Sequence, residues 1–279
     1  MLRLGLIGDN IKRSKSPLLH QLAGRLCGID IRYDPLIPAD LGLDFDAVFE
    51  RCRTAGYRGI NITYPYKERV FTALEVKDPR IRAIGACNTV LFDTDRPRGA
   101  NTDFTGFVAA FRESLPGTVP GRVAMAGAGG VGKAIAFALG ELKAAALSIF
   151  DTDAARATAL AEALRAAAPQ MDVAVAQTID EATEDADGIV NCTPLGMAGI
   201  PGTAVPAALM PNAGWAFDAV YTPVETQFLQ DAERRGLATI SGYELFFHQG
   251  VDAFHAFTGE RVDTIALRKA LRESVLEQA

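Results

Sequence analysis

The sequence predicts an α/β protein organised around a parallel sheet, and two observations support this class. The first is a glycine-rich turn at 126–132, which lies between an apolar run at 123–126 and a helical pattern that begins at Lys133. The second is the alternation of strand-like and helix-like segments from residue 123 to residue 220. Such alternation specifies a parallel sheet covered by helices on both faces. We therefore expect a doubly wound, Rossmann-type sheet in this region.

The glycine-rich turn has the spacing of a dinucleotide site. Gly127, Gly129 and Gly132 follow the pattern G-x-G-x-x-G, which serves a tight turn, close approach of the backbone to a pyrophosphate, and helix–strand packing. Backbone N–H groups and the helix dipole favour negative charge there. Gly130 and Val131 complete the candidate cofactor contacts of the turn. A purely structural turn is the alternative, and the strand and helix on either side favour the dinucleotide.

An acidic residue follows the second apolar run of this region. Asp151 comes directly after 147–150, where a carboxylate can accept hydrogen bonds from the ribose of the adenosine. Asp153 adds a second carboxylate, and two carboxylates would repel the 2′-phosphate of NADP. Arg156 could stack on the adenine or partly offset that repulsion. We therefore expect NAD as the cofactor in preference to NADP.

Composition places the chain among ordinary globular proteins. Its 279 residues are 49% hydrophobic and 22% charged, with a formal net charge of −6, so one large or two medium domains are expected. This charge balance favours neither nucleic acid nor an anionic membrane surface. No apolar run approaches the roughly 20 residues of a membrane-spanning helix, and residues 1–8 are typical of a strand rather than a signal peptide. The four cysteines lie far apart, which indicates free thiols in a reducing cytoplasm and no metal site.

The remaining elements are predicted from periodicity and from glycine or proline at their ends. Strands are expected at 1–8, 31–36, 59–63, 85–92, 99–103, 123–126, 147–150, 171–175, 188–191 and 215–220. Helices are expected from Pro17 to before Gly28, at 45–55, 104–115, 131–142 and 154–168, and from Gly242 onward. The last helical segment has no strands, so we expect it to return to the first domain.

Short polar motifs recur in a fixed order along nearly the whole chain. They are Ser14-x-Ser16-Pro17, Asn61-Ile62-Thr63-x-Pro65-x-Lys67, Gly85-Ala86-x-Asn88-Thr89, Asn101-Thr102-Asp103, Asn191-x-Thr193-Pro194-Leu195-Gly196-Met197 and Gln249. This series resembles the shikimate dehydrogenase family. The resemblance implies a smaller α/β substrate domain with a mixed sheet, a Rossmann-type cofactor domain, and a cleft between them. The corresponding boundaries are 1–103 for the substrate domain, to which 241–279 returns, and 104–240 for the NAD-binding domain.

The reaction implied by the resemblance is hydride exchange between a nicotinamide and a ring alcohol or ketone of a cyclohexane or cyclohexene carboxylate. Removing hydride from an alcohol leaves a proton on oxygen, which a group within hydrogen-bond reach must accept. Lys67 is the candidate acid/base and Asp103 its orienting partner. The alternatives are a solvated lysine at 67 and a helix N-cap at Asp103.

The resemblance also implies the binding residues. Those for the ring acid are Ser14 and Ser16, which suit its carboxylate, and Asn61, Thr63, Asn88 and Gln249, which suit its hydroxyls. Thr193 and Tyr221 are added to the cofactor contacts. Ser16 has a helix cap as its alternative, and Tyr64 a place in the core or at the rim of the site. We interpret the three histidines as structural, although His248 beside Gln249 could touch the pocket.

Three features resemble the NAD-dependent quinate/shikimate dehydrogenase branch of the family: the acid at 151, the motif Asn-Ile-Thr-x-Pro-Tyr-Lys at 61–67, and Val-Tyr-x-Pro-x-Glu-Thr at 220–226. The enzyme alternatives are an NADP-dependent biosynthetic shikimate dehydrogenase and a relative that acts on a modified ring acid. The non-enzyme alternative is a metabolite-binding sensor, which would predict loss of Lys67, Asp103 or the glycine turn. No residue decides between quinate and shikimate or between a biosynthetic and a catabolic role, and a homo-oligomer stays open. The expected partner is a small cyclic hydroxy acid, in the cytoplasm, without nucleic acid or membrane.

Overall fold

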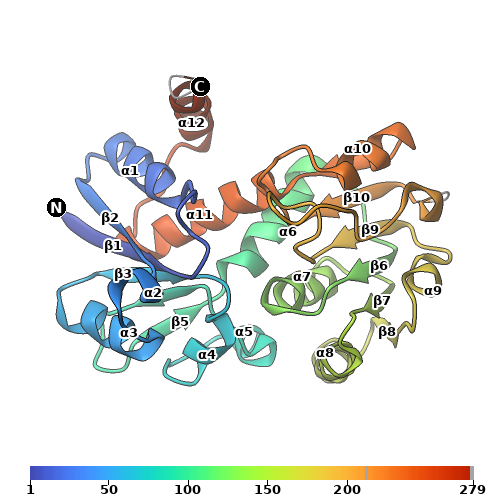
Figure 1. Cartoon of the computed structure of the whole chain (residues 1–279), viewed down its shortest axis with the longest axis horizontal. Helices are drawn as coiled ribbons and strands as arrows, with labels where there is room; N and C mark the ends of the chain where they lie inside the picture. The colour runs from blue at the N-terminus through green and yellow to red at the C-terminus, as the bar shows by residue number, and fades with distance from the viewer. Residues whose placement is uncertain (211–212, 277–279) are drawn as a thin grey trace. The chain divides into compact units, whose positions relative to one another are not determined.

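The computed structural model describes residues 1–210 and 213–276, which divide into two compact units (Figure 1). Unit 1 is formed by residues 1–102 and the segment from Gln249 onward, and unit 2 by residues 103–248. The chain passes from one unit to the other inside two helices, α6 (Thr102–Ser114) and α11 (Gly242–Thr258).

Unit 1 contains a five-stranded mixed sheet in the order β2-β1-β3-β4-β5. β1 pairs in parallel with β2 and β3, whereas β3–β4 and β4–β5 are antiparallel. The strands are β1 (Leu2–Ile7), β2 (Ile31–Leu36), β3 (Gly59–Ile62), β4 (Thr89–Leu91) and β5 (Arg98–Ala100). The other helices of this unit are α1 (Ser16–Leu26), α2 (Pro38–Leu41), α3 (Phe45–Thr54), α4 (Lys67–Phe71), α5 (Pro79–Ile84) and α12 (Thr264–Leu276). The predicted mixed sheet is confirmed.

Residues far apart in the sequence complete the core of unit 1. The buried ring of His20 in α1 stacks on Tyr33, with ring centroids 4.9 Å apart, and lies against Phe254 and Phe257 of α11. The Arg58 guanidinium donates a hydrogen bond to the Phe257 carbonyl. α12 packs against α1. The segment after residue 248 is therefore part of the same core as β1–β3.

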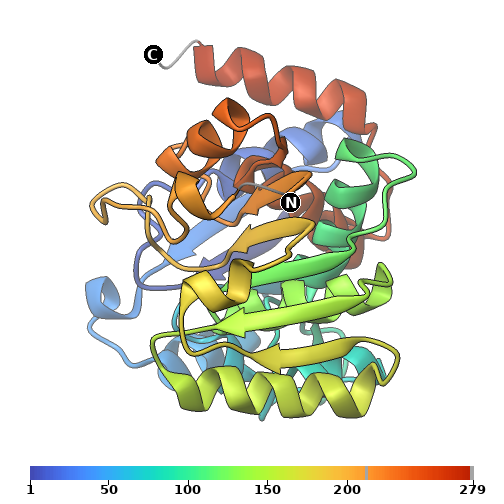
Figure 2. The ribbon, with the colours of Figure 1, turned by 90° about the vertical axis from the view of Figure 1, so that its right-hand side faces the viewer.

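Unit 2 contains a six-stranded sheet in the order β11-β10-β9-β6-β7-β8, and all of its strand pairs are parallel. Figure 2 shows these strands edge to edge, with α8 running beside them. This is the doubly wound order, in which the chain reverses direction across the sheet between β6 and β9. The predicted Rossmann-type sheet is confirmed. The strands are β6 (Arg122–Ala126), β7 (Ala146–Phe150), β8 (Asp172–Val175), β9 (Gly188–Asn191), β10 (Trp215–Asp218) and β11 (Ala238–Ile240), and the remaining helices are α7 (Gly130–Glu141), α8 (Ala154–Ala167), α9 (Ile179–Thr183), α10 (Gln227–Arg234) and the short 3-10 helix η1 (Ala207–Leu209).

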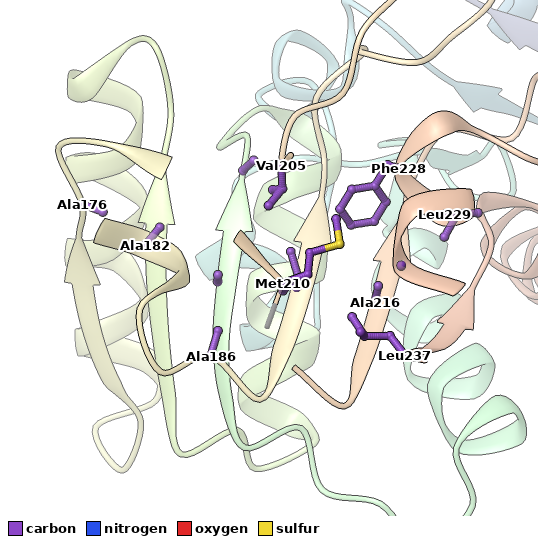
Figure 3. Packing of buried hydrophobic residues seen from close by; sticks show 13 residues of the cluster. Ala176, Ala182, Ala186, Val205, Met210, Ala216, Phe228, Leu229 and Leu237 are labelled. Carbon is purple, nitrogen blue, oxygen red and sulfur yellow. The ribbon is translucent and has the colours of Figure 1, made fainter. Parts of the chain in front are cut away.

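One buried cluster of unit 2 fixes α10 on the sheet. Ala216 of β10 presents a small side chain, and Phe228 and Leu229 of α10 pack in the same cluster. In Figure 3 the Met210 side chain extends toward the Phe228 ring, and all of these residues are buried. Because this packing holds the first turn of α10, it also fixes the loop that joins β10 to α10.

Several short elements differ from the sequence predictions. The predicted strand at 85–92 begins only at Thr89, because α5 ends at Ile84 and Gly85 caps it with a left-handed φ of 67°. The helix expected from residue 104 begins at Thr102. The continuous helix expected from Gly242 is divided into α11 and α12 around Gly259, whose φ is 80°. Within the described ranges, no helix is both long and apolar enough to cross a membrane.

Candidate active site

The glycine-rich turn joins β6 to α7, and two of its glycines are required by the protein itself. Gly127 has a φ of 98°, and a Cβ there would lie 2.8 Å from the carbonyl carbon and oxygen of Cys192. A Cβ at Gly132 would lie 2.1 Å from the Gly127 carbonyl oxygen. Gly127 therefore allows the turn to pack against the segment after β9, and Gly132 allows α7 to pack against the turn.

Gly129 differs from these two glycines because nothing in the described part of the chain requires it. Its φ of −76° and ψ of −169° lie in the extended region, which any residue adopts, and a Cβ there would meet no atom within 4 Å. Gly129 is also the N-cap of α7, where no side chain accepts a hydrogen bond from the first-turn N–H groups. Open space beside the N–H groups of a helix N-terminus suits a phosphate. The turn therefore fits the pyrophosphate of a dinucleotide.

Asp151 lies at the end of β7 and is tied to the glycine-rich turn. Its Oδ2 accepts a hydrogen bond of 2.7 Å from the Ala128 N–H, and its Oδ1 accepts one of 2.8 Å from the Asp153 N–H. Asp153 caps α8 and forms an ion pair with Arg156, with 3.3 Å between Nε and Oδ2. The positive charge of Arg156 is therefore partly neutralised by its own helix cap. The bond from Ala128 to Asp151 is not visible in the sequence.

A second polar group of unit 2 lies after β9 and β10. Asn191 Oδ1 accepts hydrogen bonds from the Thr193 N–H (2.9 Å) and Oγ1 (2.7 Å). Asn191 Nδ2 donates to Asp218 Oδ1 at 2.9 Å. Tyr221 stacks on Phe246 with ring centroids 5.2 Å apart. Sequence reasoning missed Asp218, which stands three residues before Tyr221 at the end of an apolar run, the same kind of signal that identified Asp151.

In unit 1, Ser14 and Ser16 hold each other at the start of α1. Ser14 Oγ donates to Ser16 Oγ at 3.1 Å, and the Ser16 N–H donates to Ser14 Oγ at 3.2 Å. The N-cap of α1 is Lys15, and no side chain caps the helix, so the alternative that made Ser16 a helix cap is wrong. Two half-buried hydroxyls thus lie side by side on one loop, with Lys15 exposed between them.

Asn61 and Asn88 belong to one buried network. Asn61 Nδ2 donates to the Asn88 carbonyl (3.2 Å) and to Thr89 Oγ1 (3.1 Å), and its Oδ1 accepts from Tyr33 (2.9 Å). Asn88 Oδ1 accepts from the Thr102 N–H at 2.7 Å, and its Nδ2 donates to Thr102 Oγ1 at 3.0 Å. Both amide hydrogens of Asn61 are therefore bound inside the protein, whereas Asn88 Nδ2 has a second hydrogen to donate.

Lys67 and Asp103 are both buried, with exposed fractions of 9% and 6%. Lys67 is the first residue of α4, and its carbonyl accepts a hydrogen bond from the Cys87 N–H at 2.9 Å. Because Lys67 is buried, the alternative of a solvated surface lysine is wrong. Lysine is rarely buried in proteins. Asp103 is the second residue of α6, within its first turn, so the N-cap alternative is also wrong.

The remaining candidates of unit 1 lie at the ends of elements. Thr63 follows β3, its N–H donates to the Ile7 carbonyl at 2.9 Å, and a Cβ at Gly8 would lie only 2.3 Å from its methyl group. Gln249 is half-buried on α11. Tyr64 is 74% exposed, which excludes a place in the core.

Of the histidines, His20 and His248 are buried and His255 is exposed. His248 Nε2 lies 3.2 Å from Glu113 Oε2 and 4.0 Å from Glu244 Oε2, and these three side chains form the one group of potential metal ligands found among the described residues. The contact between His248 and Glu113 joins α11 to α6. The four cysteines are free thiols.

A doubly wound unit with an anion site at the start of α7 and an acid at the end of β7 defines a dinucleotide-binding protein of the dehydrogenase kind. Residues 6–90 match the model of the shikimate dehydrogenase substrate binding domain. The chain belongs to the shikimate dehydrogenase family.

The relatives of the chain carry two kinds of name. Over 277 residues it is 39% identical to a shikimate dehydrogenase (NADP(+)) of Pseudarthrobacter chlorophenolicus, covering 98% of this chain and 94% of that one. It is also 39% identical to a quinate/shikimate dehydrogenase (NAD(+)) of Corynebacterium efficiens, covering 95% of both chains. The solved quinate dehydrogenase of Corynebacterium glutamicum in complex with NAD superimposes with a TM-score of 0.88 at 35% identity, covering 98% of this chain and 99% of that one. Overall identity therefore does not separate the NAD branch from the NADP branch.

Proposed function

We propose that this protein is an NAD-dependent quinate/shikimate dehydrogenase. It transfers a hydride between NAD(H) and a ring hydroxyl or ketone of shikimate or quinate, with 3-dehydroshikimate or 3-dehydroquinate as the oxidised form. In this proposal residues 1–103 with 241–279 form the substrate domain and residues 104–240 form the cofactor domain. These bounds differ from those of the two compact units at residue 103 and at residues 241–248. Relatives with both kinds of name support the ring acid as substrate.

The observation that carries the cofactor choice is the environment of Asp151. Its two oxygens accept one backbone N–H each, and a carboxylate oxygen can accept more than one hydrogen bond. Asp151 therefore keeps acceptor sites for the ribose hydroxyls of NAD. A 2′-phosphate would meet the charges of Asp151 and Asp153, and Arg156 is already paired with Asp153. These contacts favour NAD over NADP.

The glycine-rich turn supports the same cofactor. Gly129, Gly130, Val131 and Gly132 bind the pyrophosphate with backbone N–H groups, and the open space at Gly129 is where the phosphates approach. Gly127 contributes the shape of the turn, since its own N–H donates to the Phe150 carbonyl at 2.8 Å. Thr193 and Tyr221 contact the nicotinamide half. When bound, the nicotinamide accepts the hydride.

Lys67 is the acid/base in the proposal. As the hydride leaves the ring carbon, the C–O bond becomes a ketone, and the hydroxyl proton passes to the neutral Lys67 amine. In the reverse direction the ammonium returns that proton to the alkoxide oxygen. Asp103 orients the amine and stabilises its charged form. Burial of Lys67 supports this role, because a side chain shielded from bulk water is held in place for a substrate hydroxyl.

The ring acid is held by groups that carry no net charge. Ser14 and Ser16 donate hydroxyl hydrogens to the carboxylate, and Asn88, Thr63 and Gln249 bind ring hydroxyls. Asn61 contributes through its bonds to Asn88 and Thr89, which fix the Asn88 backbone. A substrate hydroxyl that bonds Asn61 directly either donates to Asn61 Oδ1 beside the Tyr33 hydroxyl, since an amide oxygen has two lone pairs, or replaces one of the two acceptors of Nδ2.

The second candidate is an NADP-dependent shikimate dehydrogenase, which the relative from Pseudarthrobacter chlorophenolicus favours by its name. The deciding experiment measures initial rates with purified protein for shikimate and quinate, each with NAD and with NADP. We expect kcat/KM with NAD to exceed that with NADP by roughly 10²-fold, equivalent to about 2.7 kcal/mol. A preference for NADP would show that Arg156 dominates the site. Absence of turnover with all four pairs would contradict the dehydrogenase itself.

A further inference from the structure

Asp218 is a fully buried carboxyl group, and the candidate residues of hydride and proton transfer do not include it. It ends β10 and accepts hydrogen bonds from three segments of unit 2. Its Oδ1 accepts from Asn191 Nδ2 at 2.9 Å and from the Val220 N–H at 3.0 Å, and its Oδ2 accepts from Thr226 Oγ1. One side chain thus joins the end of β9, the loop after β10 and the N-cap of α10.

The segments that Asp218 joins are those that carry the proposed nicotinamide contacts. Asn191 passes the connection on to Thr193 through both acceptor bonds of its Oδ1. The Val220 N–H donates a hydrogen bond to Asp218, and Val220 directly precedes Tyr221. A backbone bond of 2.9 Å from the Ala198 N–H to the Thr222 carbonyl joins the same two loops farther out.

Asp218 also lies at the edge of the sheet where doubly wound proteins bind their ligands. Asp218 lies beside Asn191 in the register of β10 and β9, and Asn191 lies beside Ala126 in the register of β9 and β6. β6 and β9 are the strands between which the doubly wound order reverses, and ligands bind beyond the carboxyl ends of the strands there. The loop after β9 also contacts the glycine-rich turn, since Gly127 packs on the Cys192 backbone.

The chemistry of the three donors calls for a carboxylate. Three hydrogens point at one side chain, and a carboxylate offers two oxygens with about four acceptor sites and no donor of its own. An asparagine offers one oxygen, and its NH₂ group would face either the Val220 and Asn191 donors or the Thr226 hydroxyl. Thr226 can rotate and accept instead, so asparagine would fold but would hold the α10 end of the network less firmly.

We propose that Asp218 is a positioning residue for the cofactor, which fixes the loops 191–196 and 219–226 so that Thr193 and Tyr221 meet the nicotinamide. The proposal rests on the proposed function for the identity of the ligand. It predicts that weakening the network lowers cofactor affinity while the ring acid still binds as before.

The test compares Asp218→Asn with Asp231→Asn in the whole protein. Asp231 is also a buried aspartate of unit 2, but it bonds only within its own helix, to Gln227 and Arg234, among its described contacts. We expect Asp218→Asn to raise the dissociation constant of NADH, measured by its fluorescence, roughly tenfold, as loss of one charge-assisted hydrogen bond would. KM for the ring acid and the NADH affinity of Asp231→Asn should stay within about twofold of the parent protein.

A second pair keeps the inference testable if Asp218→Asn does not fold. Thr226→Ser keeps the hydroxyl that bonds Asp218, and Thr226→Val removes it. Weaker NADH binding in Thr226→Val with recovery in Thr226→Ser supports the proposal. Equal NADH affinity in Asp218→Asn and the parent, or in both Thr226 variants, overturns it.

Binding is measured separately from turnover, so the two proposals can fail separately. If the parent protein binds NADPH instead of NADH, the same comparisons are made with NADPH. A parent protein that binds the dinucleotide but turns over no ring acid would contradict the proposed substrate and leave the role of Asp218 to be decided by these affinities.

Discussion

Replacing His20 with phenylalanine should remove a large part of the acid sensitivity of unit 1. The His20 ring is buried among Tyr33, Phe254 and Phe257, and in the described part of the chain its Nδ1 has no hydrogen-bond partner. Burial lowers the pKa of His20 from 6.5 to about 3, and this effect outweighs the opposing influence of the Asn61 side chain. The folded protein therefore holds this ring neutral where water would protonate it.

The sign and size follow from proton linkage. Between pH 6.5 and pH 3 the unfolded chain binds a proton at His20 that the folded chain does not, so the free energy of unfolding falls as the pH falls through this window. At pH 5, which lies 1.5 pH units below the unfolded value of 6.5, the loss is about 2 kcal/mol. His20→Phe keeps an aromatic ring of similar size for the stack on Tyr33 but has no group to protonate.

The assay is urea unfolding followed by circular dichroism at pH 7.5 and pH 5.0, for the parent protein and for His20→Phe. We expect the free energy of unfolding to decrease by about 2 kcal/mol less in the variant than in the parent. Amide exchange in β1 and β3 assigns the difference to unit 1. His255→Phe is the matched control, because its ring is exposed on the same unit and stays in water. An equal decrease in the parent and in His20→Phe would refute the reasoning.

Three further predictions concern the reaction. Lys67→Ala should lower kcat by roughly 10²–10⁴-fold with a smaller change in KM, as loss of acid–base catalysis does. The control is Lys77→Ala, which changes an exposed lysine and should keep normal turnover. Near-normal rates in Lys67→Ala would remove Lys67 from the mechanism. Gly129→Ala should leave the free energy of unfolding unchanged or raise it by up to about 1 kcal/mol, because the backbone at residue 129 already suits alanine. The same change should raise KM for NAD. A melting temperature that falls while KM stays the same would show that Gly129 serves the fold. Asp151→Asn with Thr152→Arg should erode or reverse the kcat/KM preference for NAD without changing KM for the ring acid, and an unchanged preference would mean that residues 151 and 152 do not select the cofactor.

Long repeated patterns made the cofactor unit predictable from the sequence. Its first two strands, β6 and β7, are each followed by a helix of at least three turns, so periodicity gave the parallel sheet and the place of the glycine-rich turn. The short helices α4 and α5 were not predicted from the sequence, for a physical reason. α4 and α5 have five and six residues, too few for a helical repeat to show, and they form because tertiary contacts bury Val70 and Ile81.

Candidate residues were easier to name than their partners. Lys67 and Asn61 stand in one motif, but their burial depends on how α4 and β3 pack. Thr89 bonds Asn61 because β3 and β4 pair in a register that places these two residues opposite each other. The spacing of residues in the sequence does not predict the register between β3 and β4. Asp218 was missed because its partners at 191, 220 and 226 come together only when the two loops and α10 fold.

The composition of unit 1 from two separate segments has a consequence for biosynthesis. A ribosome completes residues 103–248 before it reaches Phe254 and Phe257, which close the core around His20. Unit 2 is continuous in sequence, so it can fold while unit 1 waits for aromatic side chains that do not yet exist. The first 102 residues must then remain free of aggregation with β1 and β3 lacking part of their cover. Protease protection of stalled nascent chains should therefore arise first in unit 2 and in unit 1 only after α11 has emerged, which reverses the order of the units along the gene.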